Sequence, residues 1–291
     1  MPEGHTLHRL AARVRRELAG RAIRSSSPQG RFAAAASLDG EVVEDAQAHG
    51  KHLVVSFASR PEVVHVHLGL YGKVAWTRHE PGQAPPVRGQ VRWRVSAPAA
   101  GEGGPTVTAD LRGPTACELW TPEQVTALIG RLGPDPLRED ADPERAWQRI
   151  SGSRSSLAVL LMDQSVVAGV GNVYRAEVLF RQRLDPMLVG RDLQRAHFDA
   201  LWADLVALMA RGVRTGRIDT VDVEHDPVSM NRPPRRDDHG GEVYVYRRDG
   251  QPCFVCETPV ATAQVAARNL FWCPACQNGA EATRPAGTVT A

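Results

Sequence analysis

The chain has 291 residues, which is long enough for two domains that each have a hydrophobic core. Its formal net charge is only +2, so charge alone does not identify a polyanionic partner. No apolar run approaches the length of a membrane span and no export signal is recognisable, so we expect a protein of the reducing cytoplasm with no membrane partner.

A helix is predicted close to the N-terminus. Apolar residues recur there at helical spacing and Gly20 is a typical helix stop; the recurring positions are Leu7, Leu10, Ala11, Val14 and Leu18. Strand-like segments follow, separated by turns and by Pro/Gly-rich loops at 79–90 and 96–105; these segments are 41–44, 52–57, 63–68, 91–95 and 107–111. Residues 1–130 therefore predict a β-rich domain with one leading helix.

The pattern changes after residues 133–136, which read Gly-Pro-Asp-Pro. Helical periodicity is present in the segments 121–131, 143–150, 154–163, 173–183 and 194–211. Residues 169–172 predict a tight turn between two helices, where backbone N–H groups and the Asn172 amide suit an anion such as phosphate. We therefore expect a helical domain over 131–240, ending in a polar segment, 215–241, that we interpret as a mobile loop.

Four cysteines near the C-terminus have the spacing of a structural zinc site. They form two Cys-x2-Cys pairs separated by residues 257–272, and they are Cys253, Cys256, Cys273 and Cys276. Each pair brings two thiolates to one metal, and the intervening segment can fold back as a hairpin. Four sulfur ligands leave no open coordination position, which indicates a structural zinc ion. Two disulfides, or four unrelated cysteines, are the alternative.

The zinc finger is predicted to span residues 241–278. A strand at 242–247 leads into it, and the hairpin between the cysteine pairs displays Arg268. Residues 279–291 have the composition of a disordered tail. The fifth cysteine, Cys117, is expected to be an ordinary buried thiol.

The first residues have the potential for covalent chemistry. Removal of Met1 would give Pro2 a free secondary amine. The reference pKa of an α-amino group is about 7.7–8.0, and the positive end of the adjacent helix would lower it. Such an amine attacks a carbonyl-like carbon and forms an iminium (Schiff base) intermediate, with Glu3 beside it as an acid or base. The alternative is that a proline at position 2 is only a common start.

Lys51 and Lys73 are the only lysines, and all other strongly basic side chains are arginines. Because arginine stays protonated, a proton transfer by a basic side chain falls to one of these two lysines. Lys51 follows Gly50 at the leading edge of a predicted strand, where it could reach a phosphate; a solvated surface lysine is the alternative. His65 and His67 share one strand face, and without a third ligand we interpret them as packing or hydrogen-bonding residues.

Several of these segments together resemble the Fpg/Nei superfamily of bifunctional DNA glycosylases. They are the start at residues 1–4, Gly50-Lys51-His52, residues 162–174, and the run 246–250 ahead of the cysteines. The resemblance runs from residue 2 to about Gln277. It implies an α+β fold with an N-terminal β-sandwich and leading helix, a helical helix–two-turn–helix domain, and a zinc-finger β-hairpin with one structural Zn²⁺.

The resemblance also implies roles for individual residues. Pro2 would attack the anomeric carbon of a flipped nucleotide, and Glu3 would act as acid or base at the sugar ring. Lys51 would donate a proton during the β- and δ-elimination that follows. The phosphates that flank the lesion would be held by Asn172, Arg268 and Tyr246.

Residues 67–72 resemble the wedge loop of endonuclease VIII, in which apolar side chains fill the gap left by the extruded base. Leu70 and Tyr71 match that loop, whereas Gly69 replaces a polar wedge residue. The formamidopyrimidine-DNA glycosylase branch uses an Arg-Phe-Gly element, but here Arg112, a further expected DNA contact, is followed by Gly-Pro. These features favour the endonuclease VIII branch.

We therefore expect an endonuclease VIII-like DNA glycosylase/AP lyase of base excision repair that removes oxidised pyrimidines. Its partner would be double-stranded DNA containing oxidised bases or abasic sites, and it would act as a monomer at the nucleoid in a bacterial cytoplasm. Two alternatives stay open: the same chemistry on oxidised purines (formamidopyrimidine or 8-oxoguanine), and a non-catalytic zinc-finger DNA-binding protein.

Overall fold

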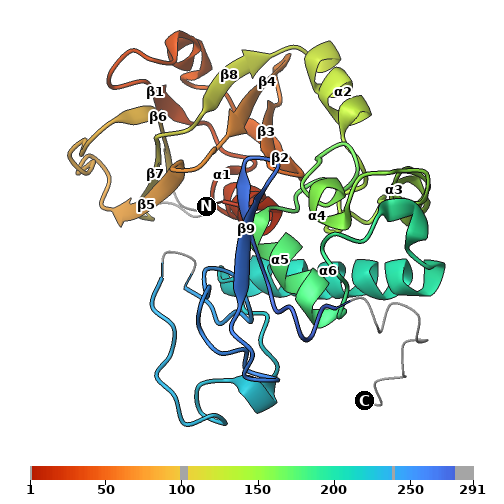
Figure 1. The fold of residues 1–291 in the computed structure, drawn as a ribbon. Helices are drawn as coiled ribbons and strands as arrows, with labels where there is room; N and C mark the ends of the chain where they lie inside the picture. Colours follow the sequence, from red (N-terminus) through yellow and green to blue (C-terminus); the bar gives the residue numbers. More distant parts are fainter. Residues whose placement is uncertain (1, 99–103, 238–239, 279–291) are drawn as a thin grey trace. The chain divides into compact units, whose positions relative to one another are not determined.

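The structure is a computed structural model that describes residues 2–98, 104–237 and 240–278 (Figure 1). The chain divides into two compact units, Met1–Arg131 and Leu132–Ala291, and each has its own cluster of buried apolar side chains. The disordered tail predicted at 279–291 lies outside the described residues. Within the described ranges, no helix combines the length and the apolar character needed to cross a membrane.

Two four-stranded antiparallel sheets form the first unit (Figure 1), with the strand orders β1-β6-β7-β5 and β2-β3-β4-β8. The strands are β1 (Arg24–Ser26), β2 (Val43–His49), β3 (His52–Phe57), β4 (Arg60–His67), β5 (Lys73–His79), β6 (Val91–Pro98), β7 (Thr106–Arg112) and β8 (Ala116–Trp120). Helix α1 (Gly4–Leu18) precedes them, a 3-10 helix, η1 (Ala33–Leu38), follows β1, and α2 (Pro122–Arg131) ends the unit.

The core of this unit contains α1 and side chains from both sheets. The helix buries an apolar face at helical spacing, and packs against β2 and β3; the buried face consists of Leu7, Leu10, Ala11, Val14 and Leu18. The same cluster includes strand residues from both sheets, among them Phe57, Val64, Val66, Trp93, Val95 and Leu111. The predicted β-sandwich with a leading helix is confirmed.

The strands differ from the prediction in three places. The strand predicted at 41–44 begins at Val43 and continues to His49, and β6 extends to Pro98, inside the predicted loop 96–105. Strands β1, β5 and β8 are absent from the prediction. All three are edge strands on which most side chains stay exposed or half-buried, so their apolar and polar residues do not alternate clearly.

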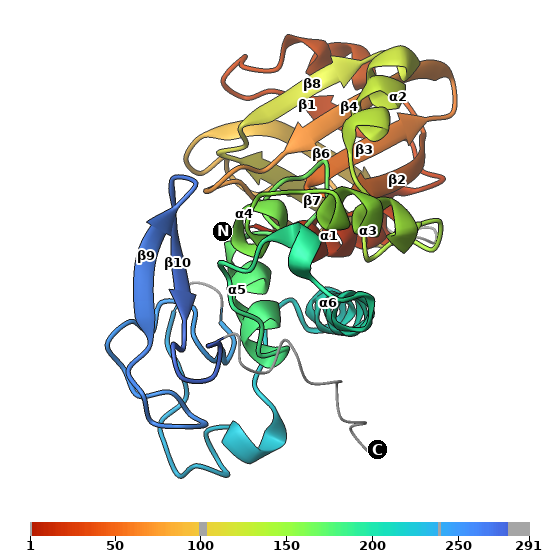
Figure 2. The same ribbon diagram turned by 45° about the vertical axis from the view of Figure 1, so that its right-hand side comes forward.

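Helices predominate in the second unit (Figure 2): α3 (Pro143–Ser151), α4 (Leu157–Leu160), α5 (Asn172–Arg181) and α6 (Arg195–Thr215), with the 3-10 turns η2 (Gly190–Asp192) and η3 (Val223–His225). Helix α5 is buried along its length, from Asn172 to Phe180. The tight turn predicted at 169–172 precedes it, and Gly169 there has a φ of 88°.

The helix predicted at 154–163 is wrong beyond a single turn, because only α4 is helical there. The side chains that follow α4 bind nearby backbone N–H groups in a non-helical geometry. Asp163 Oδ1 accepts from the N–H of Ser165 at 2.8 Å, and Gln164 Oε1 accepts from the N–H of Gly169 at 3.0 Å. These local hydrogen bonds compete with helix formation and shape the turn before α5.

The strand predicted at 242–247 is also wrong. The N–H groups of Tyr244, Val245 and Tyr246 donate to the carboxylate of Glu177 on α5, at 2.7, 2.9 and 2.8 Å. Glu177 is fully buried. Because one carboxylate satisfies three consecutive backbone donors, the segment wraps around a side chain and has no strand partner.

The polar segment 215–241 has little regular structure after α6 ends, as predicted; η3 is its one short helix among the described residues. Several of its side chains nevertheless bind the rest of the unit. The Thr220 hydroxyl donates to Glu177 at 2.5 Å, and Arg232 forms an ion pair with Glu242 at 2.7 Å. The mobility of this segment stays a prediction.

A two-stranded antiparallel hairpin, β9 (Ala261–Val265) and β10 (Arg268–Trp272), lies between the two cysteine pairs (Figure 2). Val265 pairs with Arg268, so the turn consists of Ala266 and Ala267 alone. Both alanines have positive φ, 50° and 58°. Such turns usually take Asn-Gly, because a left-handed conformation costs about 1–2 kcal/mol per L-residue.

Candidate active site and nucleic-acid interface

Pro2 and Glu3 lie immediately before α1. Gly4 is the first helical residue, Glu3 occupies the capping position, and the Glu3 side chain is completely buried. The Glu3 carbonyl oxygen accepts from the N–H of Thr6 at 2.9 Å. Pro2 is half-buried and lies one residue outside the helix, where the partial positive charge of the helix end would favour the neutral form of an amine freed by removal of Met1.

Lys51 lies in the two-residue turn between β2 and β3. His49 pairs with His52 across this turn, and Gly50 has a φ of 58°, which a two-residue hairpin turn requires. Burial lowers the pKa of His67, and the charge of Lys51 lowers it further, so these two side chains lie within electrostatic range of each other. The turn thus places a lysine next to the end of β4, where the predicted wedge loop begins.

Three aromatic rings stack on the face of the β2-β3-β4-β8 sheet opposite the core. His52 Nδ1 lies 2.9 Å from Nε2 of His65, and the His65 ring stacks on Trp120 with centroids 3.6 Å apart. Burial lowers the pKa of His52 to about 3, with a smaller contribution from neighbouring positive charges, and lowers the pKa of His65 to about 4 against the opposing charge of Glu118. Both rings are therefore neutral at pH 7, and both make packing and hydrogen-bonding contacts.

The segment predicted as a wedge loop, residues 67–72, presents two large apolar side chains to solvent. Leu70 is 46% exposed and Tyr71 is 84% exposed. Gly69 has a φ of 66°, and a Cβ added there would lie 1.9 Å from Oγ1 of Thr115. Gly69, which stands where the family has a polar wedge residue, is therefore favoured both by the close approach of Thr115 and by its own positive φ.

Arg112 ends β7 and is held by Asp110, with Nη2 3.1 Å from Oδ2. The buried Asp110 carboxylate also binds Arg94, at 2.6 and 2.8 Å. These two guanidinium groups outweigh the effect of burial and lower the pKa of Asp110. The side chain of Arg112 is 27% exposed, so its predicted contact with DNA would have to use the donors that Asp110 does not occupy.

Hydrogen bonds to Asn269 hold α5, which begins at Asn172, against β10, which begins at Arg268. Asn172 Nδ2 donates to the carbonyl oxygen of Asn269 at 2.9 Å, and Arg175 Nη2 donates both to that oxygen and to Asn172 Oδ1. Asn172 is the first residue of α5, and the exposed Arg268 is the first residue of β10. These contacts hold the start of the strand that carries the exposed Arg268 against the first residue of α5, and both an arginine and a helix N-terminus suit a phosphate group.

Tyr246 lies in the interior of the second unit, although the prediction expected it to contact DNA. Only 2% of the residue is exposed, and its ring packs edge-on against Phe271 of β10 with centroids 5.4 Å apart. A phosphate contact would be limited to that small exposed part. The Tyr246 ring packs β10 against the segment whose N–H groups bind Glu177.

Two fully buried charged residues on α5, Arg175 and Glu177, were not predicted from the sequence. Arg175 Nη1 also donates to the carbonyl oxygen of Ala158 at 3.1 Å, so the guanidinium joins α4, α5 and β10. The available signal was their position within the apolar run 173–180. Charged residues in such a run are buried, and a buried charge needs partners.

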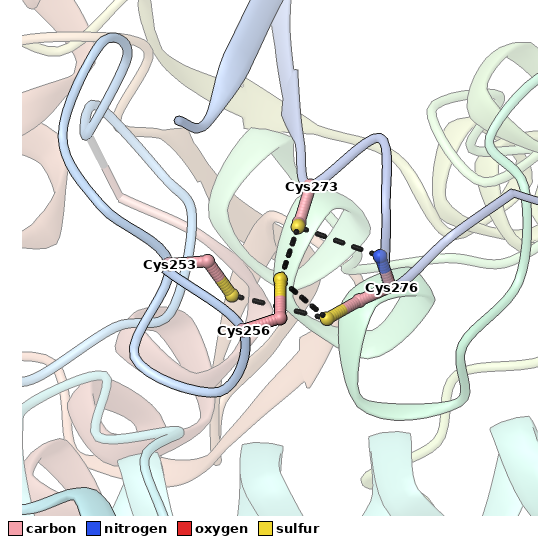
Figure 3. A group of neighbouring side chains, drawn as sticks. All are labelled: Cys253, Cys256, Cys273 and Cys276. Atoms are coloured by element: carbon pink, nitrogen blue, oxygen red, sulfur yellow. Dashed lines mark hydrogen bonds between the residues drawn. The ribbon is translucent and has the colours of Figure 1, made fainter. Parts of the chain in front are cut away.

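The four predicted cysteines form one cluster, with all sulfur atoms within 4.8 Å of one another (Figure 3). The Sγ–Sγ distances are 3.4 Å for Cys256–Cys273, 3.4 Å for Cys256–Cys276 and 3.9 Å for Cys253–Cys276. A tetrahedral zinc ion with Zn–S bonds of about 2.3 Å requires sulfur separations of about 3.8 Å. These separations exceed the length of a disulfide, about 2.05 Å, so the disulfide alternative is wrong and the cluster fits one structural zinc ion.

Three family profiles match consecutive parts of the chain. They are the formamidopyrimidine-DNA glycosylase N-terminal domain at residues 1–117, the formamidopyrimidine-DNA glycosylase H2TH domain at 132–223, and the zinc finger found in FPG and IleRS at 250–279. The first two cover most of the chain, and the third contains all four zinc ligands.

Named relatives match over almost the whole chain. Endonuclease 8 1 of Mycobacterium tuberculosis (strain ATCC 25618 / H37Rv) is 51% identical over 279 residues, covering 95% of this chain and 100% of the relative. Formamidopyrimidine-DNA glycosylase of Gloeobacter violaceus is 31% identical over 254 residues, covering 85% and 84%. The crystal structure of MutM (Fpg) protein from Thermus thermophilus superposes with a TM-score of 0.71 at 25% identity, covering 95% and 99%. The chain therefore belongs to the Fpg/Nei family of DNA glycosylases/AP lyases, close to endonuclease VIII.

Proposed function

We propose that this protein excises oxidised pyrimidines from duplex DNA and then cleaves the strand, with Pro2 as the nucleophile. The observation that carries the proposal is the start of α1. Pro2 lies one residue before the positive end of a 15-residue helix, and the adjacent Glu3 side chain is completely buried. This environment favours the neutral, nucleophilic form of an N-terminal amine and restricts the neighbouring carboxyl group to a fixed position.

In the proposed reaction, the Pro2 nitrogen attacks C1′ of the damaged nucleotide. The base leaves with the electron pair of the broken glycosidic bond, and the sugar ring opens as Glu3 exchanges a proton with it. The resulting iminium acidifies the neighbouring C–H bond, so β- and then δ-elimination expel the two flanking phosphates. Lys51, which lies in the turn between β2 and β3 near the wedge loop, supplies a proton to a departing phosphate.

The DNA contacts divide into two groups. In the first unit, the exposed Leu70 and Tyr71 would fill the gap left by the extruded nucleotide. In the second unit, Arg268 and Asn172 would bind backbone phosphates, and the four-cysteine zinc site holds the base of the hairpin that carries Arg268. We also propose that one chain acts alone on nucleoid DNA, which light scattering of the protein–DNA complex would test.

Borohydride trapping on DNA with an abasic site tests the covalent step. A covalent adduct is expected with protein whose free Pro2 has been verified by mass spectrometry. A variant with one residue added before Pro2 keeps every side chain but removes the secondary amine, and should give no adduct. An adduct of unchanged yield in that variant would exclude Pro2 as the nucleophile and leave a different amine to be identified.

The role of Lys51 has a matched control, because the chain contains one other lysine. Lys51→Ala should slow strand cleavage by about 10²-fold or more, the usual contribution of a general acid, and should leave adduct formation intact. Lys73, exposed at the start of β5, provides the control variant Lys73→Ala, which should cleave at the normal rate. Equal cleavage rates for the two variants would contradict the assignment.

Oxidised purines are the second candidate substrates, because the chain also matches formamidopyrimidine-DNA glycosylase of Gloeobacter violaceus at 31% identity. The sequence Leu-Tyr in the wedge loop and the Gly-Pro after Arg112 favour pyrimidines. A panel of duplexes with defined oxidised pyrimidines and purines would decide between them by single-turnover excision rates. Faster excision of 8-oxoguanine or formamidopyrimidine than of oxidised pyrimidines would reverse the preference.

A further inference from the structure

A cleft in the second unit is lined mainly by arginines that take no part in the proposed reaction. Five guanidinium groups line it together with two carboxylates, those of Asp237 and Glu242, which leaves three positive charges in excess; the arginines are Arg232, Arg235, Arg236, Arg247 and Arg248. The cleft encloses about 940 Å³ including its open mouth. That volume is within the range of small-ligand sites.

The two carboxylates are already occupied by two of the arginines. Arg232 Nη1 lies 2.7 Å from Glu242 Oε2, and Arg235 Nη2 lies 2.5 Å from Asp237 Oδ2. Arg235 also donates from Nη2 to the carbonyl oxygen of Tyr246 at 3.0 Å. These contacts hold both arginines in place, and they leave no carboxylate of the cleft lining to neutralise the other three.

Arg248 is fixed at the buried side of the cleft by neutral partners. Its Nη2 donates to the carbonyl oxygen of Pro252 at 2.7 Å, and its guanidinium carbon lies 3.4 Å from the centre of the Phe254 ring. Arg232 lies over the same ring at 4.1 Å. Burial lowers the pKa of Arg248 to about 10, and the charges of Arg232 and Arg235 contribute to this in the same direction. An anion in the cleft would relieve this repulsion.

Arg236 and Arg247 are exposed, and within the described part of the chain neither has a carboxylate at ion-pair distance. Arg247 has a φ of 54°, a left-handed conformation that is unfavourable for any residue other than glycine. Its side chain lies over the Tyr246 ring at 5.4 Å. Two exposed guanidinium groups with no carboxylate partner among the described residues therefore line a cleft whose other three arginines are held by hydrogen bonds.

We propose that this cleft binds a phosphate group. Guanidinium groups match the geometry of phosphate oxygens and bind them in pairs of hydrogen bonds. The cleft is distinct from the Arg268 position, because its lining residues include none from β9 or β10. The phosphate comes either from a DNA backbone or from a free di- or triphosphate, and the inference does not depend on the chemistry at Pro2.

The test compares the double variant Arg236→Ala/Arg247→Ala with a charge-matched control, Arg211→Ala/Arg214→Ala, on the exposed side of α6. Two ligands are titrated into each full-length protein: an undamaged DNA duplex, followed by fluorescence anisotropy at several salt concentrations, and inorganic pyrophosphate, followed by calorimetry. Undamaged DNA is used so that no result depends on base excision. Thermal unfolding of each variant checks that it is folded.

We expect the cleft variant to lose at least tenfold in affinity for one of the two ligands, and the control to lose less than threefold. A loss for DNA, with a salt slope flattened by about one to two units, identifies the source as the nucleic-acid backbone. A loss confined to pyrophosphate identifies a free phosphate compound. Equal losses in the two double variants, or no loss in the cleft variant for either ligand, would overturn the proposal. The charge-retaining double variant, Arg236→Lys/Arg247→Lys, should recover part of the affinity.

Discussion

The two units position their candidate site residues by different physical means. In the first unit, Lys51 lies in the turn between the paired strands β2 and β3, and Leu70 and Tyr71 lie in the short connection from β4 of one sheet to β5 of the other. Glycines at positive φ, Gly50 and Gly69, allow both connections. The strand ladders satisfy the backbone, so the turns need few side-chain hydrogen bonds.

In the second unit, Asn172 and Arg268 begin α5 and β10, and the segments that pack around these two elements have little regular structure. Glu177 binds three successive backbone N–H groups, Arg175 links α5 to the hairpin, and four thiolates provide a metal site. Irregular backbone needs such partners because a buried N–H or C=O group without a hydrogen bond is costly. The second unit should therefore be the more sensitive of the two to single changes of charge or metal content.

Removal of the zinc ion is expected to have the largest effect. Structural zinc sites of this type contribute on the order of 10–16 kcal/mol of binding free energy to folding, so chelation should unfold the region from Cys253 to Cys276 and abolish DNA binding. Circular dichroism should retain the β-sheet signal of the first unit. Metal release, circular dichroism and DNA anisotropy recorded on the same sample measure this. Undiminished DNA binding after complete zinc loss would show that the two units do not differ in this way.

The substitution Glu177→Ala should have the next largest effect. It should lower the free energy of unfolding by about 3–5 kcal/mol, because this is the usual result of removing one partner from a buried charged network. The backbone donors of residues 244–246 would lose their common acceptor. Glu144→Ala on α3 removes an exposed carboxylate paired with Arg195 and should cost less than about 1 kcal/mol. Urea unfolding of both variants makes the comparison, and equal losses would refute a special role for Glu177.

The stacked histidines of the first unit should make its stability depend on pH. Their folded-state pKa values, about 3 for His52 and about 4 for His65, lie below the ordinary value of 6.5. As the pH falls below 6.5, the unfolded chain takes up protons that the folded chain does not, so stability decreases. The expected slope is up to about 1.4 kcal/mol per pH unit for each histidine.

Urea unfolding of the first unit at pH 7 and pH 5 measures this slope, and His52→Gln should reduce it. The reduction should be less than half, because His65 and His67, whose pKa values are also lowered, would still resist protonation. A slope that is unchanged in the variant would mean that other groups cause the pH dependence.

Relief of the hairpin turn should have the smallest effect and the opposite sign. Ala266→Asn with Ala267→Gly would replace two left-handed alanines by the residues that tolerate this turn, and should stabilise the hairpin by about 1–2 kcal/mol. Ala263→Gly, on the exposed side of β9, is the control and should destabilise by about 0.5–1 kcal/mol. Thermal unfolding of the zinc-loaded protein measures both. A destabilised Asn-Gly variant would indicate that the alanine turn is not strained.

Local patterns in the sequence were sufficient for the elements whose cause is local. The spacing of four cysteines identified the zinc site, because two short Cys-x2-Cys pairs place thiolates together wherever the rest of the chain lies. The periodicity of apolar residues identified α1, because a helix repeats its buried face every three or four residues. The motifs around Pro2, Lys51 and Asn172, taken together, identified the family.

Only the tertiary structure decided the features that depend on partners distant in the chain. Residues 242–247 have a strand pattern, but their donors bind Glu177, which lies more than sixty residues earlier in the chain. Tyr246 is buried because Phe271 packs on it, and the Asn172 amide binds the carbonyl oxygen of Asn269. Periodicity indicates only which face of a segment is apolar. The hydrogen-bond partner of a buried donor or acceptor can lie far away in the chain, so it is determined only when the chain has folded.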